Sequence, residues 1–351
     1  MAGKHRRAWR RTPENRAGNA RRERAFTLLE IVVAMGISAL LFWLLLAAVN
    51  QFSNTARRAS GGASAFDEAR AAVGEIRRTL EAATLNPYWA VSYDADGYPG
   101  GYHRQSDLHF LGLPAADLFP AGSAVSGDAL FFQAPLGYEA ANPEPGAVLN
   151  ALGYFVEWRD TRRDNPVSPS PAPAPRWRFQ LREIRQAAEA LAVMLPGAGG
   201  NQWVRDAIAG EASVPVAENI AWMRLRFRWP LSGSEAMGYR WESRLWDGDG
   251  TAPQPAQSHQ VPPVVDIALL ALDESTAARL EDHGSTPPSL PLQNLFADPA
   301  ALDADLRTLE ERLAAQWPGS AFRILRATVG IRSAKWSLDP TAPDPPEETP
   351  E

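Results

Sequence analysis

The sequence contains no cysteine. Disulfide bonds, thiolate metal sites and cysteine nucleophiles are therefore excluded. The chain has 351 residues, of which 45% are hydrophobic, so it is long enough to bury a sizeable core without cross-links. We expect that core to be what stabilises any folded domain.

The sequence also lacks the short motifs of common catalytic sites. It has no nucleophile elbow, no phosphate-binding glycine loop and no zinc-binding helix motif. No two of its five histidines lie at metal-ligand spacing; they are His5, His103, His109, His259 and His283. We therefore predict that the protein is not an enzyme, that it has no cofactor, and that its histidines beyond the leader are surface or satisfied core residues.

Two acidic turns leave calcium binding open as an alternative. Asp94 and Asp96 precede one glycine, and Asp247 and Asp249 precede another. Closely spaced carboxylates with glycine can ligate calcium. Neither turn has the third acidic position or the distal glutamate of a calcium loop, and turn chemistry alone explains both. We predict no metal site.

Charge is distributed unevenly along the chain. Residues 1–25 carry nine lysines and arginines against two glutamates, although the whole chain has a net charge of −6. A basic head can bind nucleic acid, but directly before an apolar run it more often sets membrane orientation. The prediction is a cytoplasmic leader over residues 1–25, everything after Asn50 outside, and no nucleic-acid partner.

The apolar run covers residues 26–49 and reads FTLLEIVVAMGISALLFWLLLAAV. As a helix, these 24 residues span about 36 Å, which is enough to cross a bilayer core. We predict a single-pass helix in the inner membrane, in contact with lipid. A cleavable secretory signal is the alternative, but its apolar stretch is usually shorter.

A second helical segment is expected over residues 50–84, directly after the apolar run. One of its faces repeats apolar side chains at steps of three and four, at Ala65, Ala69, Val73, Ile76 and Leu80. Ser60, Gly61 and Gly62 are expected to kink or loosen it. The pattern predicts one long helix whose second half packs on a globular domain.

Glu30 is the only charged residue of the apolar run. A carboxylate costs about 2.5 to 3.5 kcal/mol near the centre of a membrane helix, and less near its end. One interpretation is a tolerated charge near the end of the helix. The other is that Glu30 has a cationic partner inside the membrane.

The residues around Glu30 favour the second interpretation. A basic leader, the small residue Ala25, and then Phe-Thr-Leu-Leu-Glu from Phe26 resemble the type IV prepilin signature. The resemblance implies that a prepilin peptidase cuts between Ala25 and Phe26 and that the new amino terminus is methylated. It also implies that Glu30 pairs with the terminal amine of a neighbouring pilin subunit. The family usually has glycine where this chain has Ala25, so processing is expected to be slower.

The rest of the chain predicts an exported α+β domain over residues 85–337. The expected fold is pilin-like, with a long amino-terminal membrane helix followed by an antiparallel sheet. A proline-rich surface loop is expected at 164–175 and a disordered acidic tail at 338–351. A helix is expected over 299–317, and strands over 108–113, 129–136, 153–159, 176–186, 218–231, 261–274 and 322–337; the stretch 176–186 also reads as a short helix.

The clearest of these strands is residues 218–231. Arg224, Arg226 and Arg228 alternate with apolar residues, as in a half-buried strand. The arginine face is expected to be solvated or to pair with acidic residues of the domain; docking to another subunit is the alternative. Trp222 and Trp229 are expected in the core.

Several stretches between residues 60 and 337 also resemble the Verru_Chthon cassette protein C family, among them HRQSDLHF, ALFFQAPLG, QVPPVVDIALLALDE and RSAKWS. We therefore predict a minor pilin or pseudopilin of a type IV pilus or type II secretion-like assembly. Its domain would lie in the periplasm or in an extracellular filament. The alternative is a membrane-anchored exported binding protein for carbohydrate or a secreted substrate.

Overall fold

The computed structural model divides into two units, residues 1–56 and 57–351, and each is described by itself. Ala25, Phe26, Asp94, Asp247 and Asp249 lie outside the described residues, as do most of the proline-rich loop and the acidic tail. The residues described are 28–93, 96–138, 148–164, 174–194, 200–210, 213–231, 234–245, 254–255 and 257–335.

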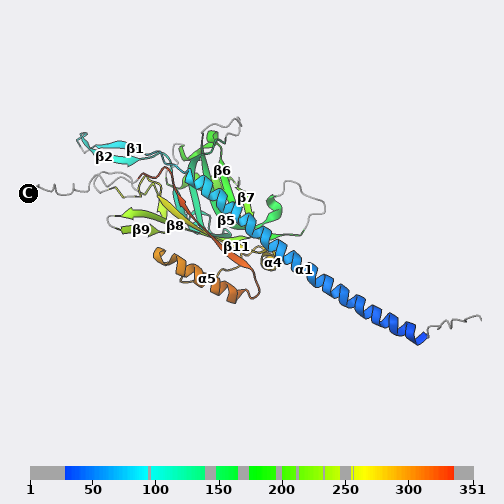
Figure 1. The fold of residues 1–351 in the computed structure, drawn as a ribbon. Helices are drawn as coiled ribbons and strands as arrows, with labels where there is room; N and C mark the ends of the chain where they lie inside the picture. Colours follow the sequence, from blue (N-terminus) through cyan, green and yellow to red (C-terminus); the bar gives the residue numbers. More distant parts are fainter. Residues whose placement is uncertain are drawn as a thin grey trace, which may run out of the picture. The chain divides into compact units, whose positions relative to one another are not determined.

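A single helix, α1 (Leu28–Glu81), covers 54 residues (Figure 1). It contains no proline and is rich in alanine, leucine and arginine, which favour helix. α1 continues through Gly61 and Gly62, because glycine costs only about 1 kcal/mol in a helix, and the kink or loosening expected there stays a prediction. Among the described residues, none of the helices is both long enough and apolar enough to cross a membrane. The membrane helix over residues 26–49 stays a prediction.

The larger of two antiparallel sheets has six described strands. Its long central strands are almost entirely buried, in accord with their aromatic and branched side chains. The spatial order is β10 (Trp241–Glu242), β3 (Leu111–Pro114), β4 (Val125–Pro135), β5 (Leu149–Asp160), β6 (Trp177–Gln186) and β7 (Ser213–Glu218).

The second sheet has four described strands, also antiparallel. A separate two-stranded hairpin, β1 (Tyr88–Tyr93) and β2 (Pro99–Gln105), extends beyond both sheets (Figure 1). This architecture confirms the α+β class and the antiparallel sheet. The order in the second sheet is β12 (Phe322–Gly330), β11 (Val264–Leu272), β8 (Ile220–Leu231) and β9 (Ser234–Gly238).

Short helices fill the connections between strands. The helix predicted over residues 299–317 is confirmed as α5 (Leu302–Gln316), which buries its four spaced leucines, Leu302, Leu306, Leu309 and Leu313. The other α-helices of the described domain are α2 (Ala115–Leu118), α3 (Gln202–Ala209) and α4 (Glu274–Leu280).

The two sheets approach each other closely where β8 crosses β3 and β4. A Cβ atom added at Gly127 would lie 2.1 Å from the carbonyl oxygen of Met223, and one added at Gly112 would lie 2.1 Å from the ring of Phe227. Only glycine fits at these two positions. The prediction that Trp222 is buried is confirmed, whereas Trp229 is half-buried.

A buried carboxylate joins the sheets at this crossing. The register of β4 shifts between Ser126 and Leu130, and this irregularity points Asp128 at β8. The Asp128 carboxylate accepts hydrogen bonds from Arg224 Nη1 at 2.9 Å and from the Leu225 amide at 2.7 Å. Burial raises the pKa of Asp128 to about 6, against the lowering effect of Arg224.

The arginine face of β8 pairs with acidic residues of the same domain, as one of the two interpretations predicted. Arg226 and Arg228 lie 2.7 and 3.1 Å from the Asp266 carboxylate on β11. Arg228 also contacts Glu235 on β9. With Arg224 bound to Asp128, all three arginines therefore have partners within the domain.

The buried histidines have hydrogen-bond partners, as predicted. His109 Nδ1 accepts from Trp203 Nε1 at 2.9 Å, so its Nε2–H is placed to donate to Glu242. His259 Nδ1 accepts from the Ser106 amide at 3.2 Å. Within the described ranges, no three His, Asp or Glu side chains gather closely enough to hold a metal ion.

Asp128 generates a pH-dependent prediction. Its folded pKa is raised from an ordinary value near 3.8, so folding loses stability as the pH rises through 4 to 6. Asp128→Asn removes this titration. We expect the stability advantage of the wild type over Asp128→Asn to shrink by up to about 3 kcal/mol between pH 3.5 and pH 7.

The measurement is urea unfolding of the full-length chain in detergent, followed by tryptophan fluorescence at each pH. Asp117→Asn is the control, because Asp117 forms only an exposed pair with Arg240. A constant difference between wild type and Asp128→Asn over this pH range would contradict the prediction.

Candidate assembly site

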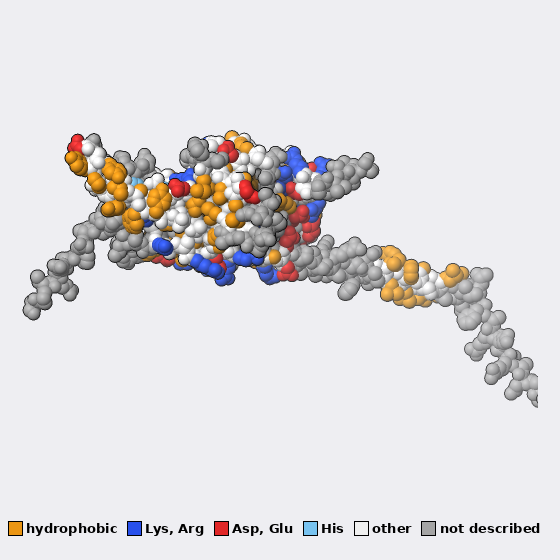
Figure 2. All heavy atoms as spheres, turned by 90° about the horizontal axis from the view of Figure 1, so that it is seen from above, with side chains coloured by type: hydrophobic (Ala, Val, Ile, Leu, Met, Phe, Trp, Pro, Cys, Tyr) orange, Lys and Arg blue, Asp and Glu red, His pale blue; other side chains and the backbone are white. Residues whose placement is uncertain are grey.

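The described side chains in the amino-terminal half of α1 are apolar and exposed. Among the large apolar side chains between Val32 and Leu46, the exposed fraction runs from 47% at Leu46 to 68% at Met35. Figure 2 shows a group of hydrophobic side chains on the visible face of this stretch. A helix that is apolar all round is stable only against lipid or other helices.

The three residues that the sequence predicts for processing and assembly lie at the start of this helix. Glu30 belongs to the first turn of α1, but its side chain is not among those described. Ala25 and Phe26 precede the described residues. The roles of all three therefore stay predictions.

The carboxyl-terminal half of α1 is part of the domain core. Its buried positions recur at steps of three and four, so one stripe of the helix faces inward. Ala69, Ile76 and Leu80 were predicted on this face and are confirmed, Val73 is half-buried, and Ala72 is an additional member. The side chain of Ala65, also predicted there, is not among those described.

A buried hydrogen-bond chain fixes this helix to the larger sheet. Thr79 Oγ1 lies 3.1 Å from the Tyr154 hydroxyl on β5, and Tyr154 donates to Glu183 Oε2 on β6 at 3.0 Å. Burial and the charge of Glu183 raise the pKa of Tyr154, so the hydroxyl keeps its proton for this bond. The chain determines how α1 is seated on β5 and β6.

The smaller sheet contacts α1 from another side. The Arg323 guanidinium on β12 lies 5.0 Å from the centre of the Phe66 ring. Just after β12, Arg332 donates from its amide to the Glu81 carbonyl at 3.1 Å, and its side chain pairs with the Glu81 carboxylate. Both sheets therefore hold the last five turns of α1.

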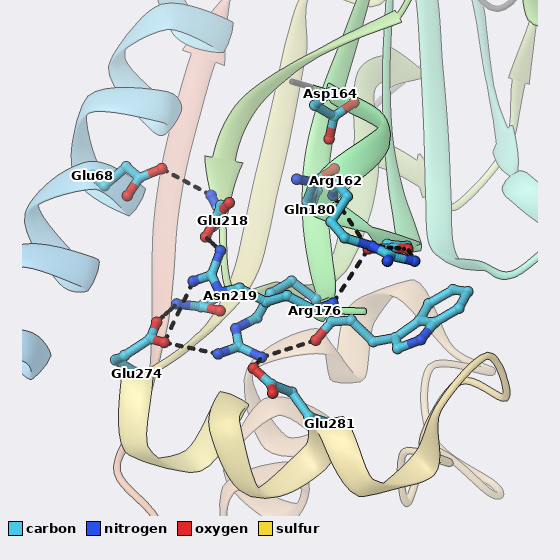
Figure 3. A network of polar contacts seen from close by, with 12 residues as sticks. Glu68, Arg162, Asp164, Arg176, Gln180, Glu218, Asn219, Glu274 and Glu281 are labelled. Atoms are coloured by element: carbon cyan, nitrogen blue, oxygen red, sulfur yellow. Dashed lines mark hydrogen bonds and ion pairs between the residues drawn. The ribbon is translucent and has the colours of Figure 1, made fainter. Parts of the chain in front are cut away.

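A polar network extends this attachment along β6, β7 and α4 (Figure 3). Glu68 of α1 accepts from the Glu218 amide at 2.8 Å, and the Glu218 carboxylate pairs with Arg176 at 2.7 Å. Arg176 also reaches Glu274, 3.4 Å away at the start of α4. Glu218 and Arg176 thus connect α1 to α4, an element distant in sequence.

Arg178 is the buried charge of this network. Its side chain is 2% exposed and contacts Glu274 at 2.8 Å and also Glu281. Burial acts to raise the pKa of Glu274, but hydrogen bonds from Arg178 and Asn219 outweigh it and hold that pKa below its ordinary value. The carboxylate therefore stays charged opposite Arg178 at neutral pH.

Comparisons with known proteins support the prepilin reading of the amino terminus. Residues 20–46 match the family profile described as a prokaryotic N-terminal methylation motif, which confirms the prepilin-type motif predicted there. The match supports a pilin-like or pseudopilin-like protein that is exported and membrane-anchored. Curated protein sequences give no significant match.

Solved structures also align with the chain. One of them is the type IV-like pilin TTHA1219 from Thermus thermophilus, with 12% sequence identity and a TM-score of 0.34. The alignment covers 76% of this chain and 97% of that one. The score is too low to establish a common fold.

Sequence reasoning missed the residues that attach α1 to the domain. Thr79 and Glu68 look like ordinary polar positions of an amphipathic helix, and Tyr154 looks like one more aromatic of a buried strand. In β6, Arg178 and Arg182 alternate with aromatic and aliphatic residues, which is typical of a half-buried strand, and only the structure shows that both arginines are buried. Buried arginines require nearby carboxylates.

The Thr79–Tyr154–Glu183 chain generates a stability prediction. Tyr154→Phe takes the hydroxyl donor away from Glu183 Oε2, whereas Thr79 Oγ1 can still donate to the Glu75 or Ile76 carbonyl. We expect the substitution to lower the free energy of unfolding by about 1–3 kcal/mol. Thr79→Val should cost less in the Tyr154→Phe background than alone, with a coupling of at least about 0.5 kcal/mol. Urea unfolding of the four chains measures this cycle.

Tyr102→Phe serves as the control, because Tyr102 is a largely exposed tyrosine of the hairpin. Additive effects of the Thr79 and Tyr154 substitutions would show that the two hydroxyls do not interact in solution.

Proposed function

We propose that the protein is a minor pilin or pseudopilin, a structural subunit of a type IV pilus or type II secretion-like assembly, and not an enzyme. The observation that carries this proposal is the methylation-motif match at residues 20–46, which overlaps the exposed apolar half of α1. Such a helix requires lipid before assembly and neighbouring helices after it. Its partners are the prepilin peptidase and other pilin subunits.

The proposed processing explains why a glutamate stands in the apolar segment. Cleavage between Ala25 and Phe26 would leave a charged amine one helical turn from Glu30. A lone charge is costly in lipid, and pairing with an opposite charge reduces that cost. Glu30 of one subunit and the methylated Phe26 amine of the next would each supply the missing partner when subunits meet.

The proposed location follows from the charge pattern. Nine basic residues before the apolar run place the leader in the cytoplasm, and the domain would then face the periplasm or an extracellular filament. The helix over residues 26–49 would cross the inner membrane once. Membership of the Verru_Chthon cassette protein C family stays a prediction.

The first test is mass spectrometry of the amino terminus of the membrane-extracted protein. We expect the mature chain to begin at N-methylated Phe26 when the protein is produced with a prepilin peptidase. Ala25→Leu places a larger side chain at the cut and should leave the chain starting at Met1. Wild-type protein that still starts at Met1 would overturn the proposed processing.

The second test concerns Glu30. We expect Glu30→Ala to be cut normally but to enter filaments with its partner pilins about tenfold less well, as the loss of an ion pair worth about 1.4 kcal/mol predicts. Quantitative immunoblotting of sheared filaments measures incorporation. Asp67→Asn is the control, because Asp67 pairs only with exposed Arg70 on the same helix. Normal incorporation of Glu30→Ala would exclude the proposed role of Glu30.

A further inference from the structure

The β1–β2 hairpin carries a group of exposed aromatic side chains. The exposed fraction is 51% for Trp89, 66% for Tyr93 and 71% for Tyr102. Figures 1 and 2 both show the hairpin extending from the rest of the domain, and in Figure 2 it is largely covered by side chains of the hydrophobic class. Exposed aromatic side chains gathered in one place indicate an interaction surface.

The strand register places three of these rings on one face of the hairpin. Side chains alternate along β1, and the irregularity of the ladder near Tyr93 adds its extra residue on β2, so Trp89, Val91 and Tyr93 lie on the same side of β1. Tyr102 is paired with Val91 across the ladder and shares that side. Alternate residues of a strand are about 7 Å apart, so the three rings form a row rather than one cluster. Trp89, Tyr93 and Tyr102 are called the aromatic face below.

The aromatic face is close to electrically neutral. Arg104 is paired with Trp89, but its side chain is buried and donates to the Pro255 carbonyl at 3.3 Å. Binding of nucleic acid or of an anionic lipid surface requires exposed lysines and arginines. The described part of the hairpin presents none, and the exposed Asp96 in its turn would repel anions, so a neutral ligand fits this face best.

The side-chain types narrow the ligand further. Each ring of the aromatic face combines an apolar surface with a polar group, a tyrosine hydroxyl or an indole N–H. A sugar ring has the matching character, with C–H groups on its faces and hydroxyls around its edge. A row of rings along a two-stranded ribbon also suits an extended polymer better than a small molecule, which would require a concave pocket.

We propose that the aromatic face of the β1–β2 hairpin binds a neutral polysaccharide chain. The sugar faces stack on Trp89, Tyr93 and Tyr102, and the hydroxyls exchange hydrogen bonds with the tyrosine hydroxyls and the indole N–H. This site does not depend on cleavage at Ala25 or on assembly, so a purified single subunit should bind.

The test is co-sedimentation of the full-length protein with insoluble polysaccharide. Microcrystalline cellulose and chitin are the probes, and the detergent must lack a sugar headgroup. We expect the wild type to sediment with at least one probe, and Trp89→Ala combined with Tyr102→Ala to weaken binding at least tenfold. Trp89→Phe combined with Tyr102→Phe keeps the rings and should retain most of the binding.

Tyr88→Ala is the matched control. Tyr88 is also an exposed ring of β1, but strand alternation places it on the opposite face of the hairpin. It should bind like the wild type. The unfolding midpoints of all variants must be the same. A loss of binding can then be attributed to the aromatic face and not to unfolding of the protein.

The proposal is overturned if the wild type sediments with neither probe, if both alanine substitutions leave binding unchanged, or if Tyr88→Ala weakens it equally. Sedimentation only with anionic lipid vesicles or with partner pilins would also overturn it. Because the assay uses unassembled protein, failure here leaves the proposed pilin function standing, and an uncut amino terminus leaves this proposal standing.

Discussion

The structure depends on one constraint: the last turns of α1 are part of the core of the domain they precede. Ala69, Ile76 and Leu80 are wholly buried, and the polar groups beside them are bonded to both sheets. Removing this helix would expose apolar surface of β5, β6 and β12 at once. The last turns of α1 and the exported domain are therefore one folded unit, and this part of the helix is not a separate linker.

The two sheets can share this helix only because they are themselves joined. Gly127 and Gly112 let β8 approach the larger sheet at a distance that any side chain would prevent. Asp128, the residue after Gly127, binds the Arg224 side chain and the Leu225 main-chain amide of β8. The irregularity of β4 and the buried Asp128 carboxylate therefore fix the position of β8 against the larger sheet, which hydrophobic contact alone would not do.

The parts of the fold that could be predicted from the sequence are those in which apolar residues recur at a regular spacing. The leucines of α5, the alternation in β8 and the apolar stripe of α1 each repeat regularly, and each was located correctly.

The β1–β2 hairpin was missed because its residues are exposed on both faces, which removes the alternation that indicates a strand. Likewise, the sequence around Thr79 or Glu68 does not indicate their hydrogen-bond partners on β5 and β7, because those contacts join residues distant in sequence. The processing residues, by contrast, were predicted from a local motif, and the match to residues 20–46 confirms that motif.

The way α1 enters the domain has a mechanical consequence. A pull along the helix axis loads the buried stripe, the Thr79–Tyr154 contact and the Glu68–Glu218 bond together, as in a shear joint. Contacts loaded in parallel share the force, whereas contacts opened one after another fail singly. Tension on the amino-terminal end is thus shared between β5 and β7 of the larger sheet and is not carried by a single contact.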